Sequence, residues 1–226
     1  MQPVPQRAAA PCVLITGGQG ALAQACAAAF REKGWVVIAP SHEEMDVSSA
    51  ASVEEYFGGV SRLDALVNNA AVLADKSVFN MREEDWEKVV GTNLKGAFLC
   101  SRAALAKMSP QKSGHLIHIG SWSGMRGAIG QANYAAAKAG LVGFSTSLAR
   151  ECGSDGIQSN VVLPGYMKTP MTRGVPPESD ARIREAHVLG RLNTVEEAAS
   201  FIAHLAGMRM VSGQIFQLDS RISPWA

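Results

Sequence analysis

The chain of 226 residues is long enough for one α/β domain with a large buried core, and short for two independently packed domains. Hydrophobic residues make up 47% of it and charged residues 18%, which excludes a disordered chain and a small disulfide scaffold. A formal net charge of +1, with no cluster of lysines and arginines, argues against nucleic acid or an anionic membrane surface as a partner.

The N-terminal residues 1–11 lack the apolar stretch of a secretory signal, so we expect a flexible tail there and one domain over 12–226. No run approaches the roughly 18 apolar residues that a membrane span needs. The four cysteines are far apart and form no CxxC spacing, which favours free thiols over disulfides or a metal site. A cytoplasmic location is therefore expected.

Short apolar runs alternate with helical patterns along the chain. Strands are predicted at 13–15, 35–39, 63–67, 116–119, 158–163 and 214–218, and helices at 21–33, 51–58, 83–108, 131–152 and 194–206. Strands that are apolar throughout and separated by helices indicate parallel pairing with right-handed crossovers. We predict a single-domain, doubly wound (Rossmann) parallel sheet with helices on both faces. Ligands of such sheets bind beyond the carboxyl ends of the strands, where the strand order reverses.

A glycine-rich turn follows the first predicted strand. Residues 16–23 read TGGQGALA and lead directly into the first helix. Glycine allows positive φ and a close approach of the backbone to a diphosphate, and the helix N-terminus beyond it offers unpaired N–H groups. The turn can therefore hold a dinucleotide, although three glycines can equally serve only to make a tight strand-to-helix turn.

Tyr134 and Lys138 lie one turn apart in a predicted helix, so their side chains share a face. An ammonium beside a phenol favours the phenolate, and moving a tyrosine pKa from about 10 to about 7 takes roughly 4 kcal/mol. The alternative is a tyrosine and a lysine on an exposed helix face with no common role.

Other polar residues stand at matching places: Asn68-Asn69-Ala70 and Ser121 follow strand ends, and Asn93 interrupts an apolar helix. In chain order, with Pro164-Gly165 and Thr169 further on, these features resemble the short-chain dehydrogenase/reductase family. Its pattern combines a glycine turn, NNAG, an active-site Asn, a Ser, YxxxK and a PG motif. The resemblance covers residues 12–219 and implies an NAD(P)-dependent oxidoreductase.

The resemblance implies a role for each catalytic residue. Tyr134 would be the general acid that protonates the carbonyl oxygen, and Ser121 would donate a hydrogen bond to the same oxygen. Lys138 would bind the nicotinamide ribose and lower the pKa of Tyr134. Asn93 would hold a water that relays protons to Lys138.

The resemblance also implies the cofactor contacts. Besides Tyr134 and Lys138, they are Gly17, Gly18, Gln19, Gly20, Ala21, Leu22, Ser41, His42, Asp46, Val47, Asn69, Ala70, Pro164, Gly165 and Thr169. Asp46 has an equal alternative as the N-cap of the next helix. NADP(H) is favoured over NAD(H), because Ser41 and His42, not an acid, follow the second strand.

Within the family, the stretches GQANYAAAKAGLVGFSTSLARE and VVLPGYMKTPMTR look like those of the 3-oxoacyl-carrier-protein reductases. This favours reduction of a 3-oxoacyl thioester or similar β-keto compound; oxidation of an alcohol, sterol or sugar and a non-catalytic dinucleotide sensor remain alternatives. An acyl carrier protein is a possible partner. Arg173 would contact it; the alternative is that Arg173 is an ordinary solvated surface residue. We expect a homotetramer or homodimer. Segment 170–190 would form a lid or an ordinary surface loop, and substrate would contact Trp122, Ser123, Tyr166 and Met167.

Three departures from the family pattern carry expectations. Ala21 and Ala23 replace glycines of the usual turn. Only Pro40 to Met45 stand where relatives usually have a helix, so the helix between the second and third strands should be shortened or absent. After the last strand the family has a glycine pair following Asp, whereas this chain reads Asp219-Ser220-Arg221; the active-site rim or a subunit contact is expected to be specialised there.

Overall fold

The computed structural model describes residues 10–222. Within them, six strands form one sheet in the order β2-β1-β3-β4-β5-β6, and every neighbouring pair is parallel. The strands are β1 (Cys12–Ile15), β2 (Val36–Ile38), β3 (Ala65–Asn68), β4 (Gly114–Ile119), β5 (Ile157–Leu163) and β6 (Ile215–Gln217). The prediction of a doubly wound parallel sheet is confirmed. The expected tail, 1–11, falls outside the described residues except for its last two.

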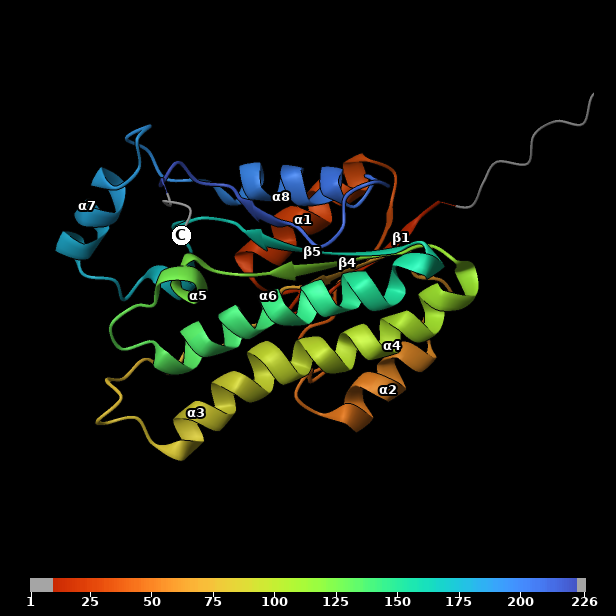
Figure 1. Ribbon diagram of the computed structural model, residues 1–226, viewed down its shortest axis with the longest axis horizontal. Helices are drawn as coiled ribbons and strands as arrows, with labels where there is room; N and C mark the ends of the chain where they lie inside the picture. The colour runs from red at the N-terminus through yellow and green to blue at the C-terminus, as the bar shows by residue number, and fades with distance from the viewer. Residues whose placement is uncertain (1–9, 223–226) are drawn as a thin grey trace, which may run out of the picture.

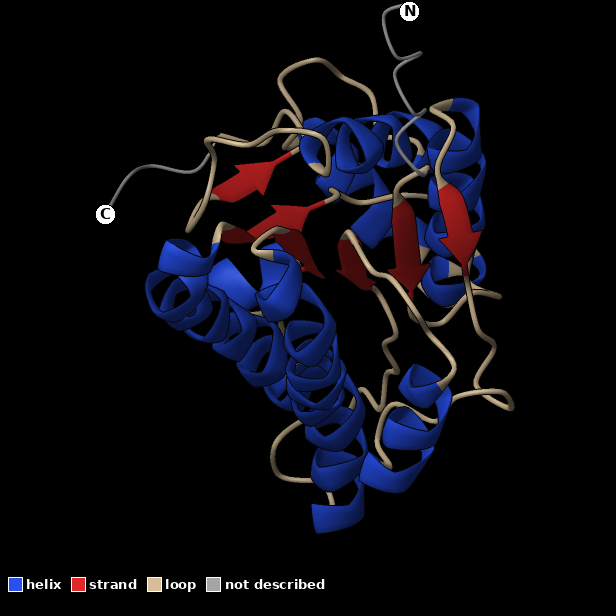
Figure 2. Cartoon of the chain, turned by 90° about the vertical axis from the view of Figure 1, so that its right-hand side faces the viewer, coloured by secondary structure: helices blue, strands red, loops and turns tan. Residues whose placement is uncertain are grey.

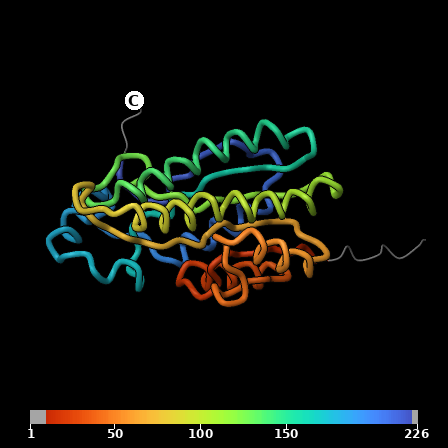
Figure 3. The backbone as a smooth tube through the Cα atoms, turned by 90° about the horizontal axis from the view of Figure 1, so that it is seen from below, coloured from red at the N-terminus to blue at the C-terminus, as the bar shows by residue number. Residues whose placement is uncertain are grey.

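Helices cover both faces of the sheet (Figures 1 and 2). Helices α1 (Ala21–Glu32) and α8 (Val195–Leu205) pack side by side on one face. The other face carries α2 (Ala50–Gly58), α4 (Gly96–Gln111) and α6 (Ala132–Cys152). Helix α3 (Glu83–Val90) continues through a π-helical turn (Gly91–Lys95) into α4, and this long rod lies alongside α6 (Figure 3).

The strands are apolar throughout because each faces a helical layer on both sides. Val13 and Ile15 are completely buried in the core under α1 and α8, together with Ile202. Leu14, between them in sequence, points to the opposite core with Leu116. Period-two alternation between two apolar cores explains the continuous hydrophobic runs in the sequence.

Residues 39–49, between β2 and α2, form turns and bends and no helix. The helix that follows, α2, has nine residues and is capped by Ser49, whose side chain accepts a hydrogen bond from Ser52 N. The helix between the second and third strands is thus present but short. Strand β2 stays at the edge of the sheet, where Val36 is 52% exposed.

The strand order reverses between β1 and β3, which are neighbours in the sheet. The carboxyl ends of the strands point toward the end of the molecule that carries α5 (Trp122–Arg126) and α7 (Pro177–Glu185) (Figure 1). The loops at this end are therefore the place to look for a site.

Over the described range, no helix is long and apolar enough to cross a membrane. All four cysteines are free, as expected, and three of them are buried. Residues 10–222 hold no group of three or more His, Cys, Asp or Glu side chains arranged to bind a metal ion.

Candidate active site

A cavity of about 1270 Å³ opens beyond the carboxyl ends of the strands. Its walls come from the turns after β1 and β3, from α5, α6 and α7, and from the loop after β5. The residues expected from the sequence that line it are Gly17, Gln19, Gly20, Ala21, Leu22, His42, Val47, Asn69, Ala70, Ser121, Trp122, Ser123, Tyr134, Lys138, Pro164, Gly165, Tyr166, Met167 and Thr169.

The glycine turn is built by close packing. Gly17 has φ +69°, and a Cβ there would lie 3.0 Å from Ala70 Cα, so this position requires glycine. A Cβ on Gly18 would lie 2.0 Å from the carbonyl oxygen of Ala39. Gly18 thus joins the turn to the end of β2 and does not line the cavity, whereas Gly20 does.

Thr16 joins the two turns at the reversal point, a role that the sequence did not predict. Its Oγ1 accepts hydrogen bonds from Asn69 N at 3.0 Å and Ala70 N at 2.9 Å. Its carbonyl accepts a third from the Asn69 amide at 3.0 Å. A buried hydroxyl directly before a glycine turn is the only sequence signal for this role, and it is a weak one.

Tyr134, Lys138 and Ser121 come together at one wall of the cavity. Lys138 Nζ lies 5.6 Å from the Tyr134 ring centroid and donates a hydrogen bond to Ile119 O at 2.6 Å. Tyr134 and Ser121 both line the cavity beside Lys138. Ser121 is held at the start of α5, where its Oγ accepts from Ser123 N at 3.2 Å.

The pKa values of the pair differ from the expectation for Tyr134. Burial raises the pKa of Tyr134 above its usual value, Asp75 raises it further, and the hydrogen bond from Ser121 only partly opposes this. Burial also lowers the pKa of Lys138 to about 8. The lowering of the phenol pKa expected from Lys138, helped by a bound nicotinamide, does not appear in the protein alone, where desolvation is the largest influence.

Asn93 lies in the π-helical turn and is buried, but it does not line the cavity. Its Oδ1 accepts from Val72 N at 2.8 Å and its Nδ2 donates to Val72 O at 3.0 Å. These bonds satisfy the amide that seemed costly in an apolar helix. They fix the segment after β3 against the helix, and the neighbouring Thr92 faces the cavity instead.

Matches with known proteins cover nearly all of this framework. The family model described as enoyl-(acyl carrier protein) reductase matches residues 19–220. The 3-oxoacyl-[acyl-carrier-protein] reductase of Escherichia coli (strain K12) is 37% identical over 215 residues, covering 85% of this chain and 88% of its own length. That of Aquifex aeolicus is 36% identical, covering 92% and 85%, and that of Synechocystis sp. is 43% identical, covering 70% and 64%.

The chain belongs to the short-chain dehydrogenase/reductase family. It is thereby an oxidoreductase of an NAD(P)-dependent class, as the motifs predicted.

At the end of the cavity where we expected adenosine, the predicted residues Ser41, His42 and Asp46 lie in the loop between β2 and α2. His42 faces the cavity and its side chain is 80% exposed, 3.9 Å from Asp46. Ser41 lies in a turn, where its N–H donates a hydrogen bond to the Glu44 carboxylate at 2.7 Å. Asp46 caps a turn by accepting from Ser48 N at 2.9 Å; the helix cap is Ser49, so the N-cap alternative for Asp46 is wrong.

The end of the cavity where we expected substrate, formed by Trp122, Ser123, Tyr166 and Met167, is called the substrate end. A chain of hydrogen bonds supports its wall. Ser123 Oγ donates to Gln131 Oε1 at 2.9 Å, and Gln131 Nε2 donates to Asp75 at 2.7 Å. All three residues line the cavity, and only Ser123 was predicted. Gln131 has one sequence signal, its place just before the helix that carries the family's YxxxK motif.

Segment 170–190, which we expected to form a lid or an ordinary surface loop, contains a helix. Segment 170–190 includes the 3-10 turn Pro170–Thr172 and α7, and Val175, Ile183 and Ala186 from it line the cavity. Lys168 forms an ion pair with Asp180, which ties the start of this segment to α7. Segment 170–190 thus covers part of the substrate end.

Proposed function

We propose that this protein reduces the ketone of a 3-oxoacyl thioester, or of a similar β-keto compound, with a reduced nicotinamide cofactor. One observation carries the proposal: Tyr134, Ser121 and the buried Lys138 line the same cavity, with Lys138 Nζ 5.6 Å from the centroid of the Tyr134 ring. Two hydroxyl donors in one cavity suit an oxygen that gains negative charge during reduction.

The residues of the glycine turn fit a dinucleotide. Helix α1 begins after Gly20 with no side-chain cap and no acidic residue in its first turn. Its first N–H groups and its positive end are thus available to a diphosphate at the cavity wall. Asn69 and Ala70 would line the adenosine ribose, Pro164, Gly165 and Thr169 the nicotinamide end. The cofactor supplies the hydride.

The protein's own residues handle the proton. In the proposed reaction Tyr134 gives its phenolic proton to the ketone oxygen, while Ser121 donates a hydrogen bond to that oxygen. The raised pKa of Tyr134 keeps the proton on the phenol at neutral pH, which the reductive direction requires. Lys138, charged below about pH 8, stabilises the phenolate that forms. Asn93 would also hold a water that relays a proton to Lys138. It would do so in addition to its two hydrogen bonds to Val72.

NADP(H) is the cofactor that we favour. His42 reaches the cavity at the end of β2, and a basic or small polar group there accommodates a 2′-phosphate. Asp46 and Val47 would contact the adenine. An acid in place of Ser41, the residue before His42, would instead pair with the ribose hydroxyls.

We make two assembly proposals. The matched 3-oxoacyl reductases act on substrates carried by acyl carrier protein, and Arg173 is exposed beside Thr172 and Gly174 at the cavity mouth. We propose that it contacts an acidic carrier protein. We also propose a homotetramer through α4 and α6, where Phe98 is 43% exposed; light scattering of the purified protein tests the stoichiometry.

The test is purified protein with NADPH or NADH against β-keto thioesters, diketones and quinones, with loss of reduced-cofactor absorbance as the readout. We expect thioester reduction, and a loss of at least about two orders of magnitude in kcat for Tyr134→Phe. Equal rates for the variant and wild type would discard Tyr134 as the acid. Faster turnover of alcohols with oxidised cofactor would favour the oxidative alternative.

A further inference from the structure

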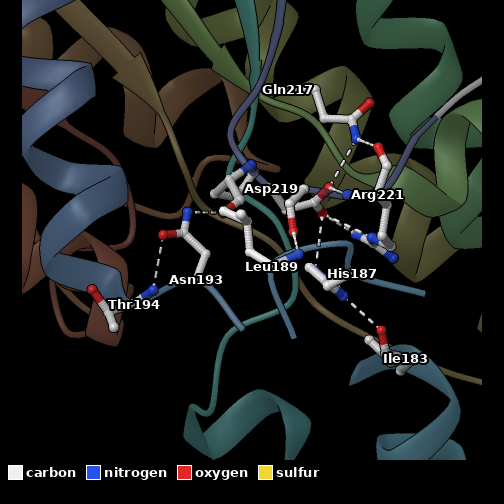
Figure 4. Close-up of polar contacts among 10 residues, drawn as sticks. Ile183, His187, Leu189, Asn193, Thr194, Gln217, Asp219 and Arg221 are labelled. Carbon is white, nitrogen blue, oxygen red and sulfur yellow. Dashed lines mark hydrogen bonds and ion pairs between the residues drawn. The ribbon is translucent and has the colours of Figure 1, made fainter. Parts of the chain in front are cut away.

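The segment after β6 builds a buried ion pair where the family has a glycine pair. Arg221 Nε donates to Asp219 Oδ2 at 2.8 Å, and its Nη2 donates to the same oxygen. Asp219 Oδ1 accepts from Gln217 Nε2 at 2.8 Å and from Arg221 N at 3.1 Å. The Asp219 side chain is 1% exposed and that of Arg221 10%. Figure 4 shows the carboxylate enclosed by these partners.

The Asp219 side chain also lies against the turn at Gly165 and against His187. A Cβ on Gly165 would lie 2.8 Å from Asp219 Cβ, so the turn expected at the nicotinamide end packs against it. His187, just beyond α7, places its Nε2 3.8 Å from Asp219 Oδ2 and its Nδ1 2.6 Å from Ile183 O (Figure 4). A β-bridge joins His187 to Arg221. The position of Arg221 is therefore fixed from several sides.

The other side of the Arg221 side chain faces the substrate end. Its guanidinium carbon lies 4.4 Å from the Trp122 ring centroid, and Arg126 approaches the same ring at 5.9 Å. Arg221 and Trp122 both line the cavity, and Trp122 directly follows Ser121 in sequence. Because Asp219 already pairs with the guanidinium, the main effects of Arg221 here are the space that it occupies and the fixed position of the indole.

We propose that Arg221, held by Asp219 and stacked on Trp122, is a specificity-determining residue that narrows the substrate end and favours compact carbonyl substrates. This inference rests on the proposed function. A short β-keto acyl chain would fit beside the stack, whereas a long or bulky one would have to displace a guanidinium that has a buried partner. Glycine at this position would leave that space open.

The experiment compares kcat/KM for acetoacetyl and 3-oxodecanoyl thioesters of N-acetylcysteamine. We expect wild type to prefer the short thioester by about tenfold or more, since one methylene in a pocket is worth roughly 10–200-fold. Arg221→Gly should raise the long-to-short ratio about tenfold. Arg209→Gly, on the exposed surface, is the control and should leave the ratio near that of wild type.

Arg221→Gly leaves the Asp219 carboxylate buried without its main partner, which is destabilising. The double variant Asp219→Asn/Arg221→Gly removes that charge and should show the same widened selectivity in a folded protein. Trp122→Ala should widen it as well, and adding Arg221→Gly to Trp122→Ala should change the ratio little further. If Asp219→Asn/Arg221→Gly is folded and its long-to-short ratio of kcat/KM equals that of wild type, the proposal is overturned.

Failure of the proposed function is distinguishable. If wild type reduces neither thioester, the proposed substrate class is wrong. The contact between Arg221 and Trp122 is then tested by the Tm of variants in thermal unfolding. The fall in Tm of Trp122→Ala/Arg221→Met should then be smaller than the sum of the two single falls, because each single variant already breaks the stack. Additive falls would overturn the coupling of Arg221 to Trp122, and with it this inference.

Discussion

Lys138 has an ammonium group in a place where charge is costly. Its side chain is buried, its Nζ donates to Ile119 O, and burial lowers its pKa to about 8. We predict that kcat/KM for carbonyl reduction falls above about pH 8, approaching tenfold per pH unit, as the ammonium loses its proton. The raised pKa of Tyr134 places loss of the phenolic proton at higher pH. A pH–rate profile measures this fall.

Lys138→Met is the matched control. It should be far less active and should lack the fall near pH 8; a fall at the same pH would assign it to another group. Stability gives a second readout. Since the folded state has the lower pKa, burial of the charged lysine costs stability below about pH 8, and this cost disappears as pH rises toward the unfolded value. The Tm of wild type should therefore rise relative to that of Lys138→Met between pH 7 and 10.

At the residue scale, the sequence predicted those contacts that depend on local spacing along the chain. Tyr134 and Lys138 share a helix face because they are four residues apart, and Ser121 joins them because parallel strand ends meet at one edge. The bond from Asn69 to Thr16 and the stacking of Arg221 on Trp122 could not be assigned in this way. These contacts join segments 53 and about 100 residues apart, and no local pattern encodes them.

Helix α5 sets the distance between Ser121 and Tyr134 by packing closely on α6. A Cβ on Gly124 would lie 2.8 Å from Ala139 N and from Lys138 C. Gly124→Ala must therefore push α5 away from α6, and we predict a loss of about tenfold or more in kcat/KM, because small misplacements of catalytic groups are expensive. Steady-state kinetics with the best thioester measures it.

Gly143→Ala, on helix α6, is the control. A Cβ there would have no neighbour within 4 Å, so kcat/KM should stay unchanged and stability should rise by up to about 1 kcal/mol. Wild-type activity in Gly124→Ala would show that α5 does not position Ser121 as we infer.

At the element scale, the six strands and the long helices were predicted to within a few residues, because both periodicity and strand runs are long signals. The rod predicted at 83–108 contains a π-helical turn at Asn93, which was not predicted. The turn depends on bonds to Val72, a residue distant in sequence. Helices α5 and α7 were also missed, since the first is very short and the second, mostly polar, lacks a buried face.

The whole molecule should respond to its cofactor, because the cavity joins both halves of the sheet at the strand reversal. A ligand that binds only the folded state at 100 times its Kd adds about 2.7 kcal/mol, or roughly 5–10 °C in Tm for a chain of this size. We predict a larger shift with NADPH than with NADH at equal concentration, in thermal unfolding followed by circular dichroism.

Ser41→Asp should reverse the order, because a carboxylate repels the 2′-phosphate and pairs with ribose hydroxyls. Gly20→Ala puts a Cβ 3.3 Å from the Gly17 carbonyl oxygen, within the glycine turn, and should reduce both shifts. The Tm of the variant without cofactor shows whether it is folded. Equal shifts for both cofactors in wild type and in Ser41→Asp would refute the basis for cofactor choice at the end of β2.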